Sequence, residues 1–332
     1  MWGFPLSSCP RGSFLVVLGR TRSQHKEISG DRCYSHALQG SLHFIPCPLQ
    51  SDIELIVRTI GVAASICVAV SASAQQVDVP RRVGDPQILA VNVLLGGLTA
   101  ASWRAATHRP IWRGFARGAA AGAGVYVGKK LIGSGKPAGW WTGRQVAALA
   151  SSEVVNAAKT LPFLETAVMP LGPIRIHIDR AKRSVSPRLD LLASVSTIVI
   201  ATRSDSRFAW RESLSTGVPV FLRPEVSNQV GNYAAGVVSL SELVPDGKFP
   251  PLETKRVVIS HEMVHAAQYD FFFTVWSDPV QQAIARKLSV AGGISRFVDV
   301  NLLLPVELAG NTAIDYKNRP WEIESLSLTK HE

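Results

Sequence analysis

The segment His261-Glu262-Met263-Val264-His265 places two imidazoles and a carboxylate at the spacing that a metal site on a helix requires. Residues four apart lie on the same face of an α-helix, so His261 and His265 can bind one Zn²⁺ together. Glu262 is then placed to accept a proton from a water on the metal. The pattern predicts a zinc site with Glu262 as its general base.

The residues around this segment predict the helix that must carry it. No glycine or proline interrupts Leu252 to Asp270, and Pro250 and Pro251 precede the stretch, where proline is favoured at a helix start. The helix would then have a side that faces the metal and an apolar side that can pack into a core. The metal-facing set is Val258, His261, Glu262 and His265, and the core-facing set is Ile259, Met263 and Ala266.

A catalytic zinc needs a third protein ligand. The only histidine after His265 is His331, and Gln268 and Phe271 stand where a metzincin would have glycine and histidine. The third ligand is therefore expected to be a carboxylate downstream of Asp270, which itself lies too close along the same helix. The candidates are Asp278, Asp299, Glu307, Asp315, Glu322, Glu324 and Glu332.

A short helix opened by Pro320 is expected to carry Glu322 and Glu324. Residues two apart on a helix differ by about 200° in direction, so only one of these carboxylates can face the zinc. The other carboxylate would either contact one of the zinc ligands without touching the metal or face solvent.

The segments His261–Gln268 and Tyr316–Ser325 resemble the bacterial gluzincin-type metallopeptidases, and the second is also similar to the third-ligand helix of integral-membrane gluzincins. The resemblance covers about residues 250–328 and departs at Ser325, where alanine is usual. It implies Glu322 as the third ligand, a zincin-like α+β domain and hydrolysis of a protein or peptide substrate.

Two other carboxylates remain alternatives as third ligand. Residues 311–316 resemble the aspartate motif of aspzincins, with different glycine and tyrosine spacing, which would make Asp315 the ligand. Glu307 follows Pro305 and also fits a helix start. Tyr316 and Tyr269 are the candidates to stabilise the oxyanion that forms during hydrolysis.

Upstream of the motif, apolar and β-branched residues recur with the period of strands. We expect Ala234–Leu240 to form the edge strand that could pair with an extended peptide. His177 is expected to be structural. The four predicted strands are Ile174–Asp179, Val195–Thr202, Val218–Leu222 and Ala234–Leu240.

The first part of the chain has a different character. Residues 57–74 have a basic start, an apolar stretch and an A-x-A site, as a secretory signal does. Residues 1–56 show no periodicity and are interpreted as a misassigned start, with translation beginning at Val57. These features predict export to the periplasm, the envelope or the medium. All four cysteines lie at or before Cys67, which leaves the mature chain without thiol ligands.

Residues 83–160 predict a Gly/Ala-rich helical region, followed by a zincin-like domain over 161–332. Residues 81–145 hold ten Lys or Arg and a single acid, Asp85, within a chain of net charge +10. Glycines at four-residue spacing (Gly114, Gly118 and Gly122) allow close helix packing. Residues 88–132 either lie on or in a membrane surface or belong to a soluble Ala-rich helical domain packed against the peptidase, and no motif indicates nucleic-acid binding.

Together these features predict an exported zinc metallopeptidase. Two interpretations that assign the protein to a different functional class remain open. In one, the zinc only holds an envelope protein together and Glu262 has no role. In the other, the chain is a membrane interaction protein in which the histidine spacing is accidental.

Overall fold

The computed structural model describes residues 82–203, 205–226, 231–243, 252–287, 293–302, 314 and 318–329. They belong to one compact unit of mixed α and β structure. The segments predicted as a misassigned start and a signal, residues 1–56 and 57–74, lie outside the described residues.

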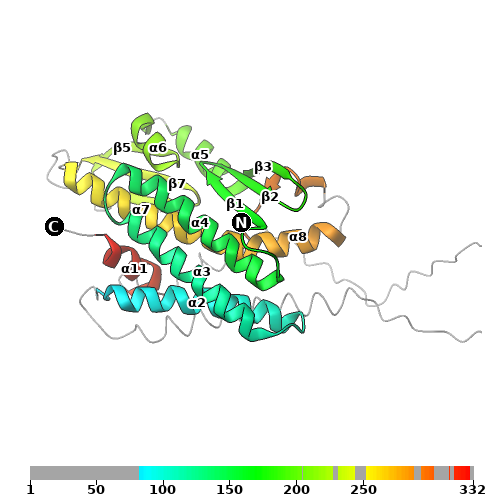
Figure 1. Cartoon of the computed structure of the whole chain (residues 1–332). Coiled ribbons are helices and arrows are strands. Elements are labelled where there is room, and N and C mark those ends of the chain that lie inside the picture. The colour runs from blue at the N-terminus through cyan, green and yellow to red at the C-terminus, as the bar shows by residue number, and fades with distance from the viewer. Residues whose placement is uncertain are drawn as a thin grey trace, which may run out of the picture. The chain divides into compact units, whose positions relative to one another are not determined.

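Helices make up most of the described residues, and Figure 1 shows their arrangement. One π-helical turn, η1 (Phe273–Ser277), joins two of them. The described helices are α2 (Asp85–Ala106), α3 (Ile111–Ile132), α4 (Pro137–Lys159), α5 (Leu191–Ala201), α6 (Trp210–Thr216), α7 (Leu252–Phe272), α8 (Asp278–Lys287) and α11 (Pro320–Leu328).

The strands form two sheets of four. The first has the order β1-β2-β3-β8 and the second the order β4-β5-β7-β6. Their strands are β1 (Thr166–Leu171), β2 (Ile174–Asp179), β3 (Ser184–Asp190), β4 (Arg207–Phe208), β5 (Val220–Val226), β6 (Gly231–Ala234), β7 (Val237–Leu243) and β8 (Val298–Asp299).

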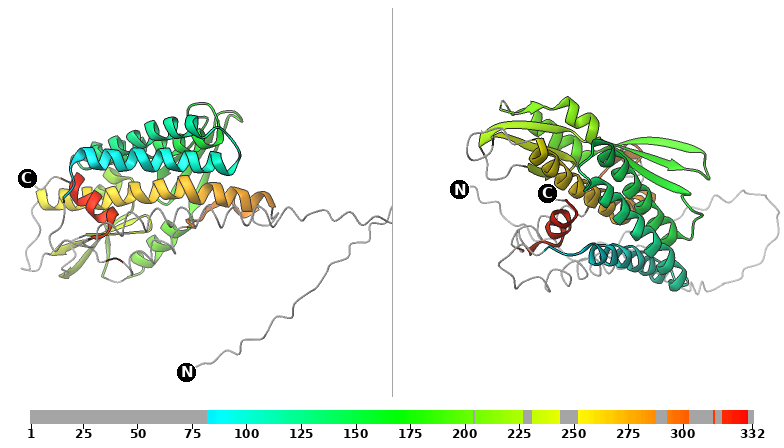
Figure 2. Two further views of the ribbon diagram at one scale, coloured as in Figure 1. Left: turned by 90° about the horizontal axis from the view of Figure 1, so that it is seen from below. Right: turned by 60° about the vertical axis from the view of Figure 1, so that its left-hand side comes forward.

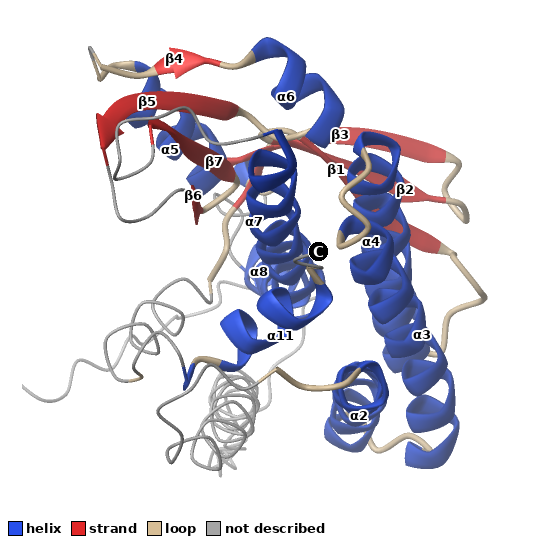
Figure 3. Ribbon diagram, turned by 90° about the vertical axis from the view of Figure 1, so that its left-hand side faces the viewer, coloured by secondary structure: helices blue, strands red, loops and turns tan. Residues whose placement is uncertain are grey.

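The sheets, with α5 and α6, lie on one side of α7 and α4, while α2 and α11 lie on the other side (Figures 2 and 3). One buried cluster joins the two sides. It contains Ile132 of α3, Trp140 of α4, Val220 of β5, Met263 of α7 and Leu328 of α11. The helical region and the β part therefore share a core, and both position α7.

Glycines let α2, α3 and α4 pack closely. A Cβ atom on Gly122 would lie 2.1 Å from the carbonyl oxygen of Asn92, and one on Gly128 would lie 2.5 Å from the carbonyl oxygen of Gly143. Such separations are far below van der Waals contact, so only glycine fits. The expected close approach at the glycine repeat is confirmed.

One predicted strand is wrong, and another is confirmed only in part. Residues 195–202, predicted as a strand, belong to α5 and the turn that follows it. The Asp190 carboxylate accepts a hydrogen bond from the backbone N–H of Ala193 and so caps α5, which outweighs the strand preference of its β-branched residues. Within the predicted edge strand Ala234–Leu240, Val237–Leu240 is indeed strand and begins β7, whereas Ala234 ends β6 and a turn at Gly236 separates the two. β7 pairs with both β5 and β6, and β6 is the edge of the described sheet.

Candidate metal centre

The helix α7 carries the two histidines and anchors them through its opposite face. Ile259, Met263 and Ala266 are fully buried in the shared core, as their spacing predicts. Because that face is fixed, His261 and His265 point together to the other side, toward α11. The predicted helix from Leu252 through the motif is confirmed.

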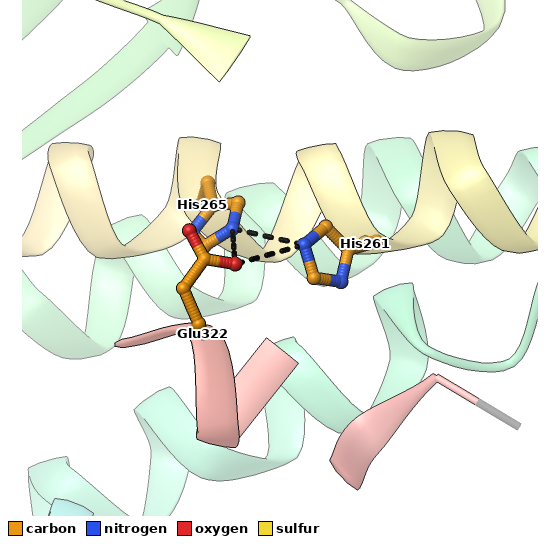
Figure 4. Close-up of side chains that lie close together, drawn as sticks. All are labelled: His261, His265 and Glu322. Carbon is orange, nitrogen blue, oxygen red and sulfur yellow. Dashed lines mark hydrogen bonds and ion pairs between the residues drawn. The ribbon is translucent and has the colours of Figure 1, made fainter. Parts of the chain in front are cut away.

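Glu322 approaches the histidines from the first turn of α11, which begins at Pro320 (Figure 4). The Nε2 atoms of His261 and His265 lie 3.1 Å apart, and the Oε2 atom of Glu322 lies 3.2 Å from each. Ligands about 2.0–2.1 Å from a tetrahedral zinc lie roughly 3.3 Å from one another. These three donor atoms therefore could hold one metal ion.

Burial and charge act against each other at this cluster. Burial favours the neutral imidazole of His265, but the hydrogen bond and negative charge of Glu322 outweigh it and raise the pKa of His265 to about 9. Burial also favours the neutral form of Glu322 and so raises its pKa. The hydrogen bonds and charges of the two histidines outweigh burial and lower the pKa of Glu322 well below its usual value. Glu322 is therefore ionised at neutral pH, as a metal ligand must be.

Gln268 orients His265 from behind. Its amide nitrogen donates to the carbonyl oxygen of Trp321 at 3.1 Å and to Oε2 of Glu324 at 2.7 Å, both of which only accept. The amide oxygen is thereby turned to Nδ1 of His265, 2.8 Å away. Nδ1 must carry the proton in this bond, so Nε2 of the neutral ring presents its lone pair to the metal position.

Glu324 points away from the histidines, as the two-residue spacing from Glu322 predicts. Its carboxylate accepts hydrogen bonds from Nζ of Lys129 at 2.8 and 2.9 Å and from Nδ2 of Asn92 at 2.7 Å. Burial raises the pKa of Glu324, but Lys129 and the other donors outweigh burial and lower it. Sequence reasoning missed Asn92 and Lys129, because they precede α11 by about two hundred residues and carry no local signal.

Glu262 lies beside the donor atoms, against the edge strand β6. A Cβ atom on Gly231 would come within 2.7 Å of its Oε1 atom, so the strand crosses directly over the carboxylate. A backbone hydrogen bond from Tyr233 also reaches Glu262. Burial raises the pKa of Glu262, although both histidines oppose the shift. A raised pKa suits a group that must both take up and release a proton.

The remaining candidate residues predicted from the sequence either bond to other partners or lie outside the described residues. Tyr269 is buried, and its hydroxyl donates to Asp190 at 3.3 Å, so this hydroxyl already has an acceptor within the fold. Asp270 instead pairs with Arg144 at 2.7 Å. Asp278 and Asp299 lie together in a separate group with His177. Tyr316, Asp315, Glu307 and Glu332 lie outside the described residues.

A second buried group contains His177, Asp278 and Asp299, whose donor atoms also lie within 4.8 Å of one another. Nε2 of His177 lies 2.6 Å from Asp299, and Arg188 already lies 3.3 Å from Asp299 and 3.9 Å from Asp278. The guanidinium supplies a positive charge to both carboxylates. We interpret this group as an ion-pair cluster that joins β2, β3, β8 and α8, in keeping with the structural role expected for His177.

No family model matches the sequence, and no curated protein and no solved structure matches the chain.

Proposed function

We propose that this protein is a zinc-dependent metallopeptidase of the gluzincin type with a zincin-like fold. The observation that carries the proposal is the convergence of His261, His265 and Glu322 from two helices at 3.1–3.2 Å, with Glu262 buried beside them. Two imidazoles and one carboxylate are a ligand set of catalytic zinc sites. A glutamate placed next to such a set is the usual general base.

The metal, Glu262 and Gln268 would each have a different role in hydrolysis. Bound Zn²⁺ would polarise a peptide carbonyl and lower the pKa of a water molecule. Glu262, which directly follows His261 in α7, would accept the proton of the attacking water and pass it to the leaving amine. Gln268 would keep His265 in the tautomer that leaves Nε2 free for the metal.

The edge strand β6 supports a peptide as the substrate. It is the last described strand of its sheet, and Gly231 lies against Glu262. An extended chain that pairs with the free side of an edge strand gains backbone hydrogen bonds. A peptide bound there would run past the general base, which is the geometry that hydrolysis needs.

The test compares Glu262→Gln with the parent in zinc content and in cleavage of a mixed quenched-peptide library. We expect about one zinc per chain in both proteins and a loss of activity of roughly 10²–10⁴-fold in the variant. Glu165→Gln, away from the donor atoms, is the matched control and should change neither quantity. His261→Ala should lose both zinc and activity.

The non-catalytic alternative gives a different result. If the zinc only holds α7 and α11 together, the parent binds zinc without cleaving peptides, and Glu262→Gln changes nothing. If no zinc binds to the parent, the proposal loses its support.

We also propose that the protein is exported and contacts an anionic membrane surface through α2. This helix is long and apolar enough to span a bilayer by length and composition, with 44% of its apolar window buried. Its outward side exposes Val91, Leu94 and Leu98 by 41–49% and carries no charge there. Trp112, 74% exposed, follows the turn after α2, next to Arg113. Apolar residues flanked by an aromatic ring and basic groups are typical of surface-bound helices.

Vesicle flotation tests this contact. The parent should float with phosphatidylglycerol vesicles at low salt, and the double variant Leu94→Glu/Leu98→Glu should not. Val127→Glu, on a half-exposed position of α3, serves as the control for added negative charge. Equal flotation of the parent and the double variant would exclude α2 as the contact surface.

A further inference from the structure

Ser325 stands at the position where the resembled peptidases have alanine, and its side chain reaches the donor atoms. It lies one turn after Glu322 on α11 and is fully buried. Its Oγ atom lies 3.3 Å from Nε2 of His261 and 3.4 Å from Nε2 of His265. Of the separations among these four donor atoms, five therefore lie between 3.1 and 3.4 Å.

The hydroxyl proton of Ser325 is engaged elsewhere. Oγ donates to the backbone carbonyl of Glu322 at 3.1 Å. A hydroxyl has one proton and two lone pairs, so the lone pairs remain for the side that faces the histidines.

The donor atoms of four side chains surround one point. Nε2 of His261, Nε2 of His265 and Oε2 of Glu322 lie 3.1–3.2 Å from one another, and Oγ of Ser325 lies 3.3–3.4 Å from both imidazole nitrogens. Ligands of a tetrahedral zinc lie roughly 3.3 Å from one another, so the Ser325 oxygen stands where a further ligand would stand.

We propose that Ser325 is a fourth protein donor of the metal centre. The inference rests on the proposed zinc site and deepens it. A neutral hydroxyl is a weaker ligand than an imidazole or a carboxylate, so water or a substrate carbonyl can displace it or add beside it as a fifth ligand. The site differs in this respect from one with alanine at the same position, which leaves the fourth place to water alone.

Cobalt substitution of the full chain tests the position of this side chain. In Ser325→Cys the new sulfur should bind Co²⁺ as thiolate, which adds a sulfur-to-cobalt charge-transfer band in the near ultraviolet. Ser327→Cys is the matched control on the same helix, because Ser327 accepts a hydrogen bond from the N–H of Val83 instead. Difference spectra against the parent remove any contribution of the natural cysteines.

A second measurement does not depend on the new thiol. Ser325→Ala should weaken the Kd for Zn²⁺ about tenfold and change the visible spectrum of the cobalt protein. The visible bands of Co²⁺ report its coordination number and are independent of peptide cleavage.

Three results decide the inference. A thiolate band in Ser325→Cys but not in Ser327→Cys, with weaker zinc binding in Ser325→Ala, supports it. Cobalt bound without such a band, or an unchanged Kd and visible spectrum in Ser325→Ala, overturns it and leaves the three-ligand site intact. A parent that binds neither metal overturns both this inference and the proposed function.

Discussion

Replacing Gln268 with leucine should weaken zinc binding without touching a ligand. The amide makes three hydrogen bonds, to His265 at 2.8 Å, to the carbonyl of Trp321 at 3.1 Å and to Glu324 at 2.7 Å. Leucine fills a similar volume and makes none of them. The ring of His265 is then free to turn or to move its proton to Nε2, where it competes with the metal.

The size of the expected loss in zinc affinity follows from the kind of contact that Gln268→Leu removes. Removing a partner that orients a ligating histidine costs roughly 10–100-fold in metal affinity, or about 1.4–2.7 kcal/mol. Part of the loss arises because Nδ1 of His265 and the carboxylate of Glu324 each keep one fewer partner in a buried place. We expect a Kd for Zn²⁺ raised by that factor.

A competition titration with a chromophoric chelator measures the Kd, and urea unfolding of the chelated protein measures stability separately. Gln281→Leu is the matched control. Gln281 is also buried and bonds the backbone of Val298 and Val300, away from the donor atoms. A Kd that stays within twofold of the parent in Gln268→Leu, or that rises equally in Gln281→Leu, would refute the reasoning.

Three further predictions concern the packing and the metal. Lys129→Met should lower the free energy of unfolding by about 3–5 kcal/mol in urea, because it leaves the partly buried carboxylate of Glu324 without its positive partner, with only the neutral donors Asn92 and Gln268. Gly122→Val should lower the thermal midpoint or prevent folding, because its Cβ would lie 2.1 Å from the carbonyl oxygen of Asn92. Removing zinc with a chelator should lower Tm in the parent, since a ligand that binds the folded state stabilises it, and should leave the Tm of His261→Ala unchanged.

Each of these three has a control or an opposing result. Lys130→Met removes an exposed ion pair with Asp85 and should cost no more than about 1 kcal/mol. Gly293→Ala meets nothing within 4 Å, so it should leave Tm unchanged, and a loss equal to that of Gly122→Val would contradict the packing argument. A parent whose Tm does not respond to chelation would not be held together by a metal.

The local parts of the site could be predicted because their signals are local. The four-residue spacing of His261 and His265 and the apolar face of α7 follow from helix geometry alone, and so does the division between Glu322 and Glu324. Strand β2 coincides with the alternating run Ile174–Asp179. These elements require only neighbours along the chain.

The parts that were missed depend on contacts distant in sequence. The apolar, largely β-branched run at residues 195–202 is typical of a strand, yet Asp190 caps a helix that extends to Ala201. The strand order of the second sheet could not be predicted from the sequence either. The pairing of β7 with β5 and β6 is a tertiary fact, and proximity in sequence pointed to the wrong edge.

The layer formed by α2 and α3 is part of the site rather than an attachment to it. Asn92 and Lys129 bind Glu324, Glu324 binds Gln268, and Gln268 holds His265. Each link joins buried or partly buried groups, where a lost partner is costly. The close glycine contacts that bring α3 against α2 therefore also set where the Lys129 charge lies. The basic, glycine-rich helices and the histidine helix must fold together for the donor atoms to meet.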